Sequence, residues 1–532
     1  MTSPRRESAA GGRRRRVIVA ESLAPEGLEL LRAHHEVDVL TGLSRRELLA
    51  ALPGHEALLV RSAVQVDAEA VAAGSDLIVI GRAGVGIDNI DLVAATRAGI
   101  TVVNAPTGNT IAAAEHTLAL LLALARRVPS ADASLRRGEW RRSAFTGSEL
   151  RGRTLGIIGL GKIGMALADR ARGLEMVLVG HDPYVTEELA THHGVRLVAL
   201  DELLRNAHAV TVHVPLTRST RGLIGAAQLA MMRPDAMLIN VARGGVIEED
   251  ALAAALHAGR LGGAAVDVFV NEPPVDSPLL GAPDTVLTPH LGASTTEAQT
   301  RVAVEAAEQV LDVLAGRPAR YAVNAPLLTP ETAGALAPYL PLARTLGQFY
   351  AQFAPDLEGL TLEVAGELAA YDASPLAAAA LGGLLETVTE ERVNLVNASH
   401  VAKAHGISMV ERKDPEAGRY ASMLTLSGST AVGGTVSAGE SRLVRLDGYW
   451  VDIPPAPQML VTRHQDRPGT MGSIGRILGE ADVNISAMHL GRAGLRADAI
   501  MILALDESVP LEAAARIREQ AAVLDLWLVR LE

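Results

Sequence analysis

Three side chains in the middle of the sequence could act together on a 2-hydroxy acid. Arg243, Glu272 and His290 each follow a short apolar run. A histidine titrates near working pH and can take a hydroxyl proton, a carboxylate can orient the imidazole, and an arginine can pair with a substrate carboxylate. Each residue alone also fits a plain loop or turn position. The prediction of hydride chemistry on a 2-hydroxy acid therefore depends on all three together.

A glycine-rich turn, Gly159-Leu160-Gly161-Lys162-Ile163-Gly164, follows an apolar run and opens a helical pattern. In this arrangement Gly159 permits a tight turn, Gly161 lets the backbone approach a pyrophosphate, and Gly164 allows the helix to lie against the sheet. Asp182 lies 18 residues after Gly164, at the end of the next predicted strand. A carboxylate there accepts ribose hydroxyls and repels a 2′-phosphate, which favours NAD over NADP.

The elements that must position these residues form two consecutive α/β units, because short apolar runs alternate with helical patterns. The strands predicted for the first unit are Val17–Ala20, Val37–Leu40, Ala57–Val60, Leu77–Gly81 and Thr101–Asn104. Those predicted for the second are Thr154–Gly159, Met176–Gly180, Ala209–Val214, Met237–Val241, Gly263–Val268 and Val286–Thr288. Both units are expected to form doubly wound parallel sheets.

The chain is expected to return to the first unit after the second, which would make the first domain discontinuous. A helix over Thr295–Leu314 leads to a predicted strand at Ala322–Asn324. Asn109 or Thr110 is expected to cap a long helix through Ala125. Catalytic segments after the strands of the second unit would then face the first unit at the edge where such sheets bind ligands.

The pattern of apolar and polar residues changes after Pro326. A helix is predicted near Leu336–Phe353, and Pro454–Pro457 reads as a linker. Beyond the linker the patterns run strand, helix, strand, strand, helix, strand, which is the ferredoxin-like order. The predicted domains are a discontinuous substrate domain (1–105 and 296–325), a cofactor domain (106–295), an α+β intervening domain (326–454) and a regulatory domain (458–532).

Composition narrows the functional class. The chain has 532 residues, a formal net charge of −12 and no cysteine. Thiolate catalysis and thiolate metal sites are therefore excluded, and nucleic acid or an anionic membrane is disfavoured as the main partner. The apolar run Val17–Ala20 after the basic residues Arg13–Arg16 is too short for an export signal, and no segment suits a membrane span. We expect a cytoplasmic protein without a metal site.

Six motifs together resemble the D-isomer-specific 2-hydroxyacid dehydrogenases: GLGKIG, HDPY, VHVPLT, NVARGG, AVDVFVNEPP and TPHLGAST. The resemblance covers most of residues 50–325 and implies NAD as cofactor and catalytic roles for Arg243, Glu272 and His290. It also implies that Asp267 contacts the nicotinamide side, and Glu272 speaks against the formate dehydrogenase branch. The cofactor-binding residues expected are Gly159, Gly161, Lys162, Ile163, Gly164, Asp182, Val214, Val241, Ala242, Arg243, Asp267, His290, Gly292 and Ala293.

The motifs RSA, GRAGVGIDNID and NAPTGNT resemble the branch of this family that oxidises D-3-phosphoglycerate to 3-phosphohydroxypyruvate, the first step of phosphorylated serine synthesis. Arginines and backbone N–H groups would hold the phosphate. Val64-Gln65 departs from some relatives, which carry a polar or basic pair there. Arg142 belongs to a segment that can reach a partner subunit. The expected substrate-binding residues are Arg61, Ser62, Arg82, Gly84, Val85, Gly86 and Arg142.

The C-terminal segment resembles an ACT domain, a small amino-acid sensor. His464, Asp466 and Asn484 match the positions that would hold L-serine between paired domains. The alternative is a dimerisation module that binds no ligand. Residues 326–454 resemble the intervening domain of the long form of this branch, which assists assembly. A homo-oligomer, either a dimer or a tetramer, is expected.

Two other functions are compatible with parts of the pattern. Another D-2-hydroxyacid dehydrogenase, such as a glycerate or hydroxypyruvate reductase, would share the catalytic set, but Arg61 and the ACT-like tail speak against it. A non-enzymatic regulator that senses NADH would not need the complete set of Arg243, Glu272 and His290.

Overall fold

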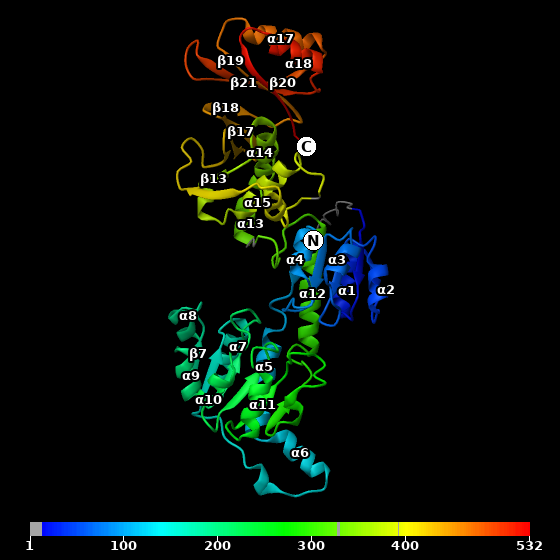
Figure 1. The fold of residues 1–532 in the computed structure, drawn as a ribbon, viewed down its shortest axis with the longest axis vertical. Coiled ribbons are helices and arrows are strands. Elements are labelled where there is room, and N and C mark those ends of the chain that lie inside the picture. Colours follow the sequence, from blue (N-terminus) through cyan, green and yellow to red (C-terminus); the bar gives the residue numbers. More distant parts are fainter. Residues whose placement is uncertain (1–12, 327–329, 392, 532) are drawn as a thin grey trace, which may run out of the picture.

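The computed structural model describes residues 13–326, 330–391 and 393–531. Four sheet-containing units follow one another along the long axis of the molecule (Figure 1). Two are parallel sheets wrapped by helices, and the other two are largely antiparallel. The predicted α/β class with a ferredoxin-like C-terminal unit is confirmed. The domain limits given above remain predictions.

The first unit is a five-stranded parallel sheet whose spatial order is β2 (Glu36–Val39), β1 (Arg16–Val19), β3 (Ala57–Val60), β4 (Val79–Arg82) and β5 (Thr101–Asn104). Its helices are α1 (Pro25–His34), α2 (Arg45–Ala51), α3 (Ala68–Ala73), α4 (Leu92–Arg97) and, from later in the chain, α12 (Thr296–Leu314). All four residues of β3 are buried, because helices cover both faces of the sheet.

The second unit is a seven-stranded parallel sheet. Its order is β12 (Thr285–Leu287), β11 (Gly263–Val266), β10 (Met237–Asn240), β9 (Ala209–Val212), β6 (Thr154–Ile158), β7 (Val177–His181) and β8 (Arg196–Leu197). Its helices are α5 (Thr110–Ala125), α6 (Val128–Arg136), α7 (Lys162–Gly173), α8 (Glu187–His192), α9 (Leu200–Asn206), α10 (Ala226–Met231) and α11 (Glu249–His257). The strand order reverses between β6 and β9, so the glycine turn after β6 lies at the switch point where such sheets bind ligands.

The third unit is a six-stranded mixed sheet in the order β14 (Met409–Asp414), β13 (Leu360–Gly366), β15 (Ser422–Ser427), β16 (Ala431–Ser437), β17 (Glu440–Leu446) and β18 (Tyr449–Ile453). It carries α13 (Pro330–Leu336), α14 (Tyr339–Phe353), α15 (Ser374–Leu385) and α16 (Ala398–Ala404). The fourth is a four-stranded antiparallel sheet in the order β20 (Ile485–Arg492), β21 (Asp498–Leu505), β19 (Gln458–Gln465) and β22 (Val523–Arg530), with α17 (Thr470–Glu480) and α18 (Leu511–Arg518).

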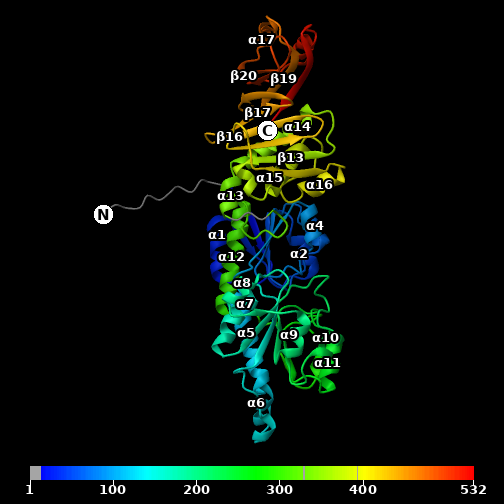
Figure 2. The same cartoon turned by 90° about the vertical axis from the view of Figure 1, so that its left-hand side faces the viewer.

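The last two units share one hydrophobic core. Met459 and Val461 of β19 and Ile502 of β21 belong to the same buried cluster as Phe349 and Tyr350 of α14. The Trp527 ring of β22 packs on Phe353 with a centroid separation of 4.8 Å. The other face of the C-terminal sheet is covered by α17 and α18. The two units therefore stack directly, as Figure 2 shows at the end of the molecule away from α6.

Three details of the sequence predictions differ from the structure. β8 was not predicted, because two residues are too few to show a periodicity. Ala322 makes a single bridge to Val103 in place of a strand, although its neighbours Tyr321 and Val323 do hydrogen-bond to the backbone of β5 and so return the chain to the first unit. Asn109 takes the N-cap position of α5, but its side chain makes no capping hydrogen bond.

Within residues 13–326, 330–391 and 393–531, none of the helices combines the length and the apolar character that a membrane span requires.

Candidate active site

His290 and Glu272 form a hydrogen-bonded pair after β12 and β11. Nδ1 of His290 lies 2.8 Å from Oε2 of Glu272, and each side chain is 39% exposed. The other carboxylate oxygen accepts the backbone N–H of Phe269 at 3.1 Å. Burial alone would raise the pKa of Glu272, but the bonds from His290 and Phe269 hold it below its ordinary value. Glu272 is therefore ionised and can orient the imidazole and stabilise its protonated form.

The backbone at His290 adopts the left-handed conformation, with φ of 55°. This region is sparsely populated by residues other than glycine and costs free energy when occupied. The backbone N–H of His290 is directed at the carbonyl oxygens of Asp267, at 2.8 Å, and Thr288, at 3.1 Å. These bonds hold the turn in its strained form, with the ring directed at Glu272.

Arg243 bridges the two parallel-sheet units. Its Nε donates to Oδ2 of Asp88 at 3.0 Å, and Nη1 donates to the carbonyl oxygen of Ala242 at 2.7 Å. Its side chain is 27% exposed. The loop after β10 is itself braced, because the Asn240 side chain donates to the Arg243 carbonyl and accepts from Ala242. Asp88 lies in the GRAGVGIDN segment, and the sequence patterns had assigned it no role.

Arg82 lies beside Arg243 in a largely buried position. Burial and the neighbouring charge of Arg243 lower the pKa of Arg82 to about 10, so it remains charged near neutral pH. Its Nε is buried and has no hydrogen-bond partner among the described residues. A β-carbon on Gly84 would fall 1.6 Å from Nη1 of Arg82, so this guanidinium lies directly on the glycine backbone. The arrangement is electropositive and suits an anion.

The loop of Arg61 is fixed by Glu21, a residue that the sequence patterns did not single out. The carboxylate of Glu21 accepts backbone N–H groups of Arg61 and Val64 at 2.8 and 3.0 Å. Arg61 lines a cavity of about 280 Å³ together with Gln299 of α12. Two other residues predicted to bind substrate have different surroundings. Ser62 is exposed, and the Val85 carbonyl accepts a hydrogen bond from the Asn104 side chain at 2.6 Å.

Arg142 is not part of this cluster. It begins the short 3-10 helix Arg142–Phe145 and is exposed. The preceding helix, α6, projects from the end of the molecule opposite the antiparallel units (Figure 1). Any contact of Arg142 with substrate would therefore have to be in another subunit, and that role stays a prediction.

The glycine turn has the geometry expected for a dinucleotide. Gly159 has φ of 91°, and no described heavy atom lies within 4 Å of a β-carbon built on Gly161, so the backbone there is open to a pyrophosphate. A β-carbon on Gly164 would fall 2.2 Å from the Gly159 carbonyl oxygen, so only glycine allows α7 to approach this closely. Asp182 accepts the backbone N–H of Leu160 at 2.9 Å, which ties this carboxylate to the turn; its contact with the ribose stays a prediction.

The remaining predicted cofactor residues surround this turn and the catalytic loops. Val214 lies against Gly159, and Val241 lies against Gly292. Nζ of Lys162 is 5.4 Å from the centroid of the Tyr321 ring. Ile163, Ala242 and Ala293 are half-buried beside them. Desolvation lowers the pKa of His213, which follows β9, to about 4, so this histidine is neutral under the turn.

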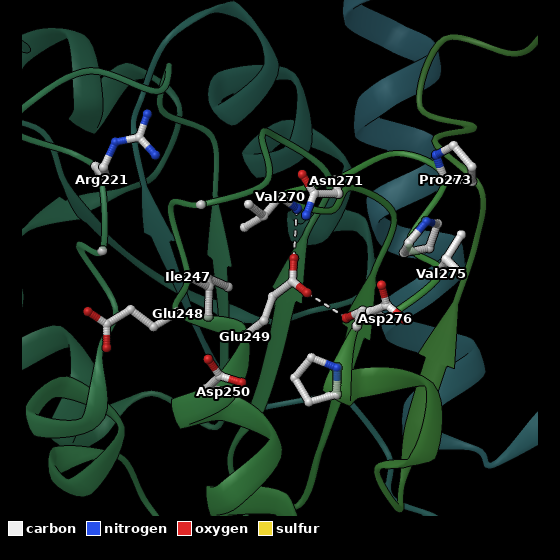
Figure 3. A pocket seen from close by; sticks show the side chains of 15 residues that line it. Arg221, Ile247, Glu248, Glu249, Asp250, Val270, Asn271, Pro273, Val275 and Asp276 are labelled. Carbon is white, nitrogen blue, oxygen red and sulfur yellow. Dashed lines mark hydrogen bonds between the residues drawn. The ribbon is translucent and has the colours of Figure 1, made fainter.

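A cavity of about 750 Å³ opens beside the Glu272 loop but includes neither His290 nor the glycine turn (Figure 3). Glu249, at the start of α11, reaches across it. Its carboxylate accepts the backbone N–H of Val270 at 2.7 Å and the hydroxyl of Ser277 at 2.5 Å. Glu249 therefore braces the loop that carries Glu272, and the sequence patterns had not pointed to it.

Comparisons with known proteins agree with this geometry. Residues 118–292 match the NAD-binding domain of the D-isomer specific 2-hydroxyacid dehydrogenases. Residues 335–447 match the D-3-phosphoglycerate dehydrogenase intervening domain, and residues 458–522 match the ACT domain. A D-3-phosphoglycerate dehydrogenase from Synechocystis is 46% identical over 97% of this chain and 95% of its own length. One from Archaeoglobus fulgidus is 40% identical over 97% of this chain and its full length.

The chain belongs to the D-3-phosphoglycerate dehydrogenase family. Its predicted cofactor, NAD, is confirmed by the matched NAD-binding domain. Among solved structures, the TT0316 protein of Thermus thermophilus is 38% identical and aligns with a TM-score of 0.54 over 58% of this chain and 99% of its own length. An NAD complex of a formate dehydrogenase from Staphylococcus aureus is 29% identical, with a TM-score of 0.52 over 57% of this chain and 96% of its own length.

In this member of the family the predicted effector residues lie at two ends of the ACT sheet. His464 pairs with Ala499, which in turn pairs with Arg492 at the end of β20. Asn484 precedes the start of the same strand. At about 3.3 Å per residue the two ends are roughly 20 Å apart. One domain therefore cannot bring His464 and Asn484 to a single small ligand.

The immediate surroundings of the effector residues are polar. Burial lowers the pKa of His464, whose ring contacts the hydroxyl of Thr462 at 3.3 Å. Asp466 accepts from Arg492 at 3.4 Å. Asn484 donates to the carboxylate of Asp506 at 2.6 Å. Gly469, with φ of 92°, starts α17 beside Asp466.

Proposed function

We propose that this chain oxidises D-3-phosphoglycerate to 3-phosphohydroxypyruvate with NAD, as the names of its relatives indicate for those proteins. The proposal is carried by two observations: Arg82 lies beside Arg243, which bridges the two parallel-sheet units, and the His290–Glu272 pair follows β12 and β11, the strands next to β10, whose loop carries Arg243. A phosphorylated hydroxy acid has two anionic ends, which call for cationic groups as well as an acid–base pair.

The roles follow from the contacts. NAD, held at the glycine turn Gly159–Gly164, would supply the acceptor for the hydride that leaves C2 of the substrate. His290 removes the hydroxyl proton, and ionised Glu272 stabilises the imidazolium that results. Arg243 pairs with the substrate carboxylate and polarises the C2 oxygen, while Arg61 and Arg82 hold the phosphate. Asp267 is fully buried and accepts backbone N–H groups of Leu291 and Gly292, and its predicted place at the nicotinamide stays a prediction.

The activity is tested by following NADH absorbance with 3-phosphohydroxypyruvate, and with hydroxypyruvate as the unphosphorylated control. The proposal requires a kcat/KM that is higher for the phosphorylated substrate by two orders of magnitude or more, since two cationic side chains lose their partner otherwise. Equal rates with both substrates would assign the chain to the reductase alternative. Absence of turnover with either would leave the cofactor-sensing alternative.

We further propose that L-serine inhibits the enzyme by binding between ACT domains of two subunits. The separation of His464 from Asn484 supports a shared site, with His464 and Asp466 from one domain and Asn484 from the other. β20 is an edge strand of its sheet, which leaves it available to a second copy.

Mixed oligomers test this arrangement. His464→Ala and Asn484→Ala should each abolish serine inhibition when expressed alone. Co-expression of the two variants should recover part of the inhibition, because one pairing then joins an unaltered His464 to an unaltered Asn484. A site contained in one domain would give no recovery in the mixture. Inhibition that survives both single substitutions would place serine elsewhere.

A cytoplasmic homo-oligomer is proposed for the same chain. Val128, Leu135 and Trp140 on and after α6 are exposed, with Trp140 at 77%. Apolar groups on a projecting arm favour burial against another copy. Size-exclusion chromatography with light scattering gives the oligomer number, and Trp140→Asp should lower it. For the intervening domain we propose the limits 326–454, and for the other domains the limits that the sequence predicts.

A further inference from the structure

His116 lies in the middle of α5 and contacts a buried carboxylate in the active-site unit. Its Nε2 is 3.1 Å from Oδ1 of Asp267 and 3.3 Å from the hydroxyl of Thr288. The His116 side chain is 18% exposed, while that of Asp267 is fully buried. α5 packs on β10, β11 and β12, so this histidine lies beside the strands whose following loops carry the catalytic residues.

Asp267 fixes the turn of His290 through both its side chain and its backbone carbonyl. Oδ1 accepts the Leu291 N–H at 2.7 Å, and Oδ2 accepts the Gly292 N–H at 2.9 Å. The Asp267 carbonyl accepts the N–H of His290 itself. The orientation of the carboxylate thus determines where the left-handed turn at residue 290 is held.

The orientation of this carboxylate depends on two side chains. The hydroxyl of Thr288 donates to Oδ1 at 2.5 Å. Since that proton is directed at Asp267, the Thr288 oxygen can only accept from His116, and the ring must carry its proton on Nε2. Burial would raise the pKa of Asp267, but the bond from His116, followed by those from Thr288 and Leu291, keeps it below its ordinary value.

We propose that His116 is a positioning residue for His290 that acts through Asp267. The ring donates to Asp267 and Thr288, and the Asp267 carboxylate accepts the Leu291 and Gly292 amides. These amides hold the strained turn that directs His290 at Glu272 and substrate. The inference deepens the proposed dehydrogenase function, because it assigns a new residue to the same site. Small displacements of a reacting group are costly for rate, so an outer hydrogen bond can control kcat.

The test compares His116→Leu with His116→Gln in the full-length enzyme. The leucine variant loses the donor and should lower kcat about tenfold with little change in the KM for NADH. The glutamine variant retains an N–H₂ donor and should recover most of the rate. Deuterium at the transferred position of NADH should give a larger kinetic isotope effect in the leucine variant, because hydride transfer becomes the slower step.

A matched control comes from the next residue. Thr117 is also buried on α5, but its hydroxyl bonds only to the Ala113 carbonyl in its own helix. Thr117→Val should change thermal stability without changing kcat or the isotope effect. If His116→Leu is insoluble, His116→Asn replaces it, since the shorter amide cannot reach Asp267.

Two results would overturn the proposal. Equal kcat and isotope effect in His116→Leu and the unaltered enzyme would show that the contact has no part in positioning. A glutamine variant as impaired as the leucine variant would show that packing, not donation, is what His116 supplies. If neither the variants nor the unaltered enzyme turn over 3-phosphohydroxypyruvate, the proposed function is wrong and the inference about His116 is not what failed. NADH binding, measured by fluorescence, would show that the proteins are nevertheless folded.

Discussion

Arg243 lies across the backbone of Gly86, so close that a β-carbon on residue 86 would fall 1.9 Å from its Nη2. Gly86 is in a conformation that other residues can adopt, and the colliding atom is the end of a flexible side chain. Gly86→Ala should therefore leave the fold intact and displace the guanidinium. We expect kcat/KM to fall by about 100-fold, since misplacement by an ångström costs this much.

Circular dichroism and NADH affinity should be unchanged in Gly86→Ala. Gly138→Ala, at an exposed turn with no neighbour within 4 Å of the new β-carbon, controls for a general effect of the substitution, although its φ of 80° makes it slightly destabilising. Normal kcat/KM in Gly86→Ala would mean that Arg243 has room to act from another position.

Arg82 is expected to stabilise the bound substrate and to lower the free energy of unfolding of the protein without substrate. Its Nε is buried and unpartnered within the described chain, and its charge lies close to that of Arg243. Arg82→Met retains the length of the side chain and removes the charge. We expect the free energy of unfolding of the two parallel-sheet units to rise by about 1–3 kcal/mol, with a higher melting temperature. The KM for 3-phosphohydroxypyruvate should rise at least tenfold.

Differential scanning calorimetry and steady-state kinetics measure both effects of Arg82→Met. The exposed Arg46 supplies the control, since Arg46→Met should change neither quantity. If Arg82→Met lowers the stability and leaves the KM unchanged, Arg82 does not bind the substrate phosphate.

Glu272 should set the pH range of catalysis. The pKa of Glu272 lies below its ordinary value in spite of burial, owing to His290 and Phe269, so the carboxylate is ionised throughout the neutral range. Reduction requires the proton on His290, and oxidation requires its absence. Glu272→Gln removes the charge that stabilises the protonated ring, so both pH profiles should move about one unit toward lower pH.

The profiles are recorded as log kcat/KM against pH in each direction. Glu248→Gln, an exposed carboxylate on the neighbouring segment, should leave both unchanged. A shift of the Glu272→Gln profiles toward higher pH would contradict the pairing, because it would mean that Glu272 disfavours the imidazolium.

The intervening and ACT units should unfold together. Trp527 packs on Phe353, and residues of both sheets occupy one core. Trp527→Ala should lower the melting temperature of a single transition that includes both units, by the equivalent of about 3 kcal/mol. Two separate transitions for residues 330–453 and 458–531 would show that the shared core does not couple them.

The sequence was sufficient for the sheets and the cofactor turn, because buried parallel strands and the glycine pattern are local signals. β3 and β5 were predicted with the bounds that the structure has, and the turn at Gly159 with its conformation. The catalytic pair was also predictable, since Glu272 and His290 each follow a strand and the strands β11 and β12 are neighbours.

The supporting residues were not predictable, because no local pattern marks them. Glu21, Asp88 and Glu249 act on loops that are distant in the chain and meet them only in the folded protein. His116 lies inside the long helix predicted through Ala125, where no pattern marks it as a site residue. The separation of His464 from Asn484 was hidden for the opposite reason: they are close in sequence, but α17 carries the chain from one end of the sheet to the other.

The loop before α16 touches the substrate unit at the end of α4. Nδ2 of Asn394 donates to the Gly99 carbonyl at 2.6 Å, and a β-carbon on Gly99 would fall 2.9 Å from the same atom. α4 starts just after Asp88, the partner of Arg243. Since the intervening and ACT units share one hydrophobic core, a tilt of paired ACT domains would be transmitted to the Asn394 loop, and through Gly99 and α4 to the segment of Asp88, the partner of Arg243.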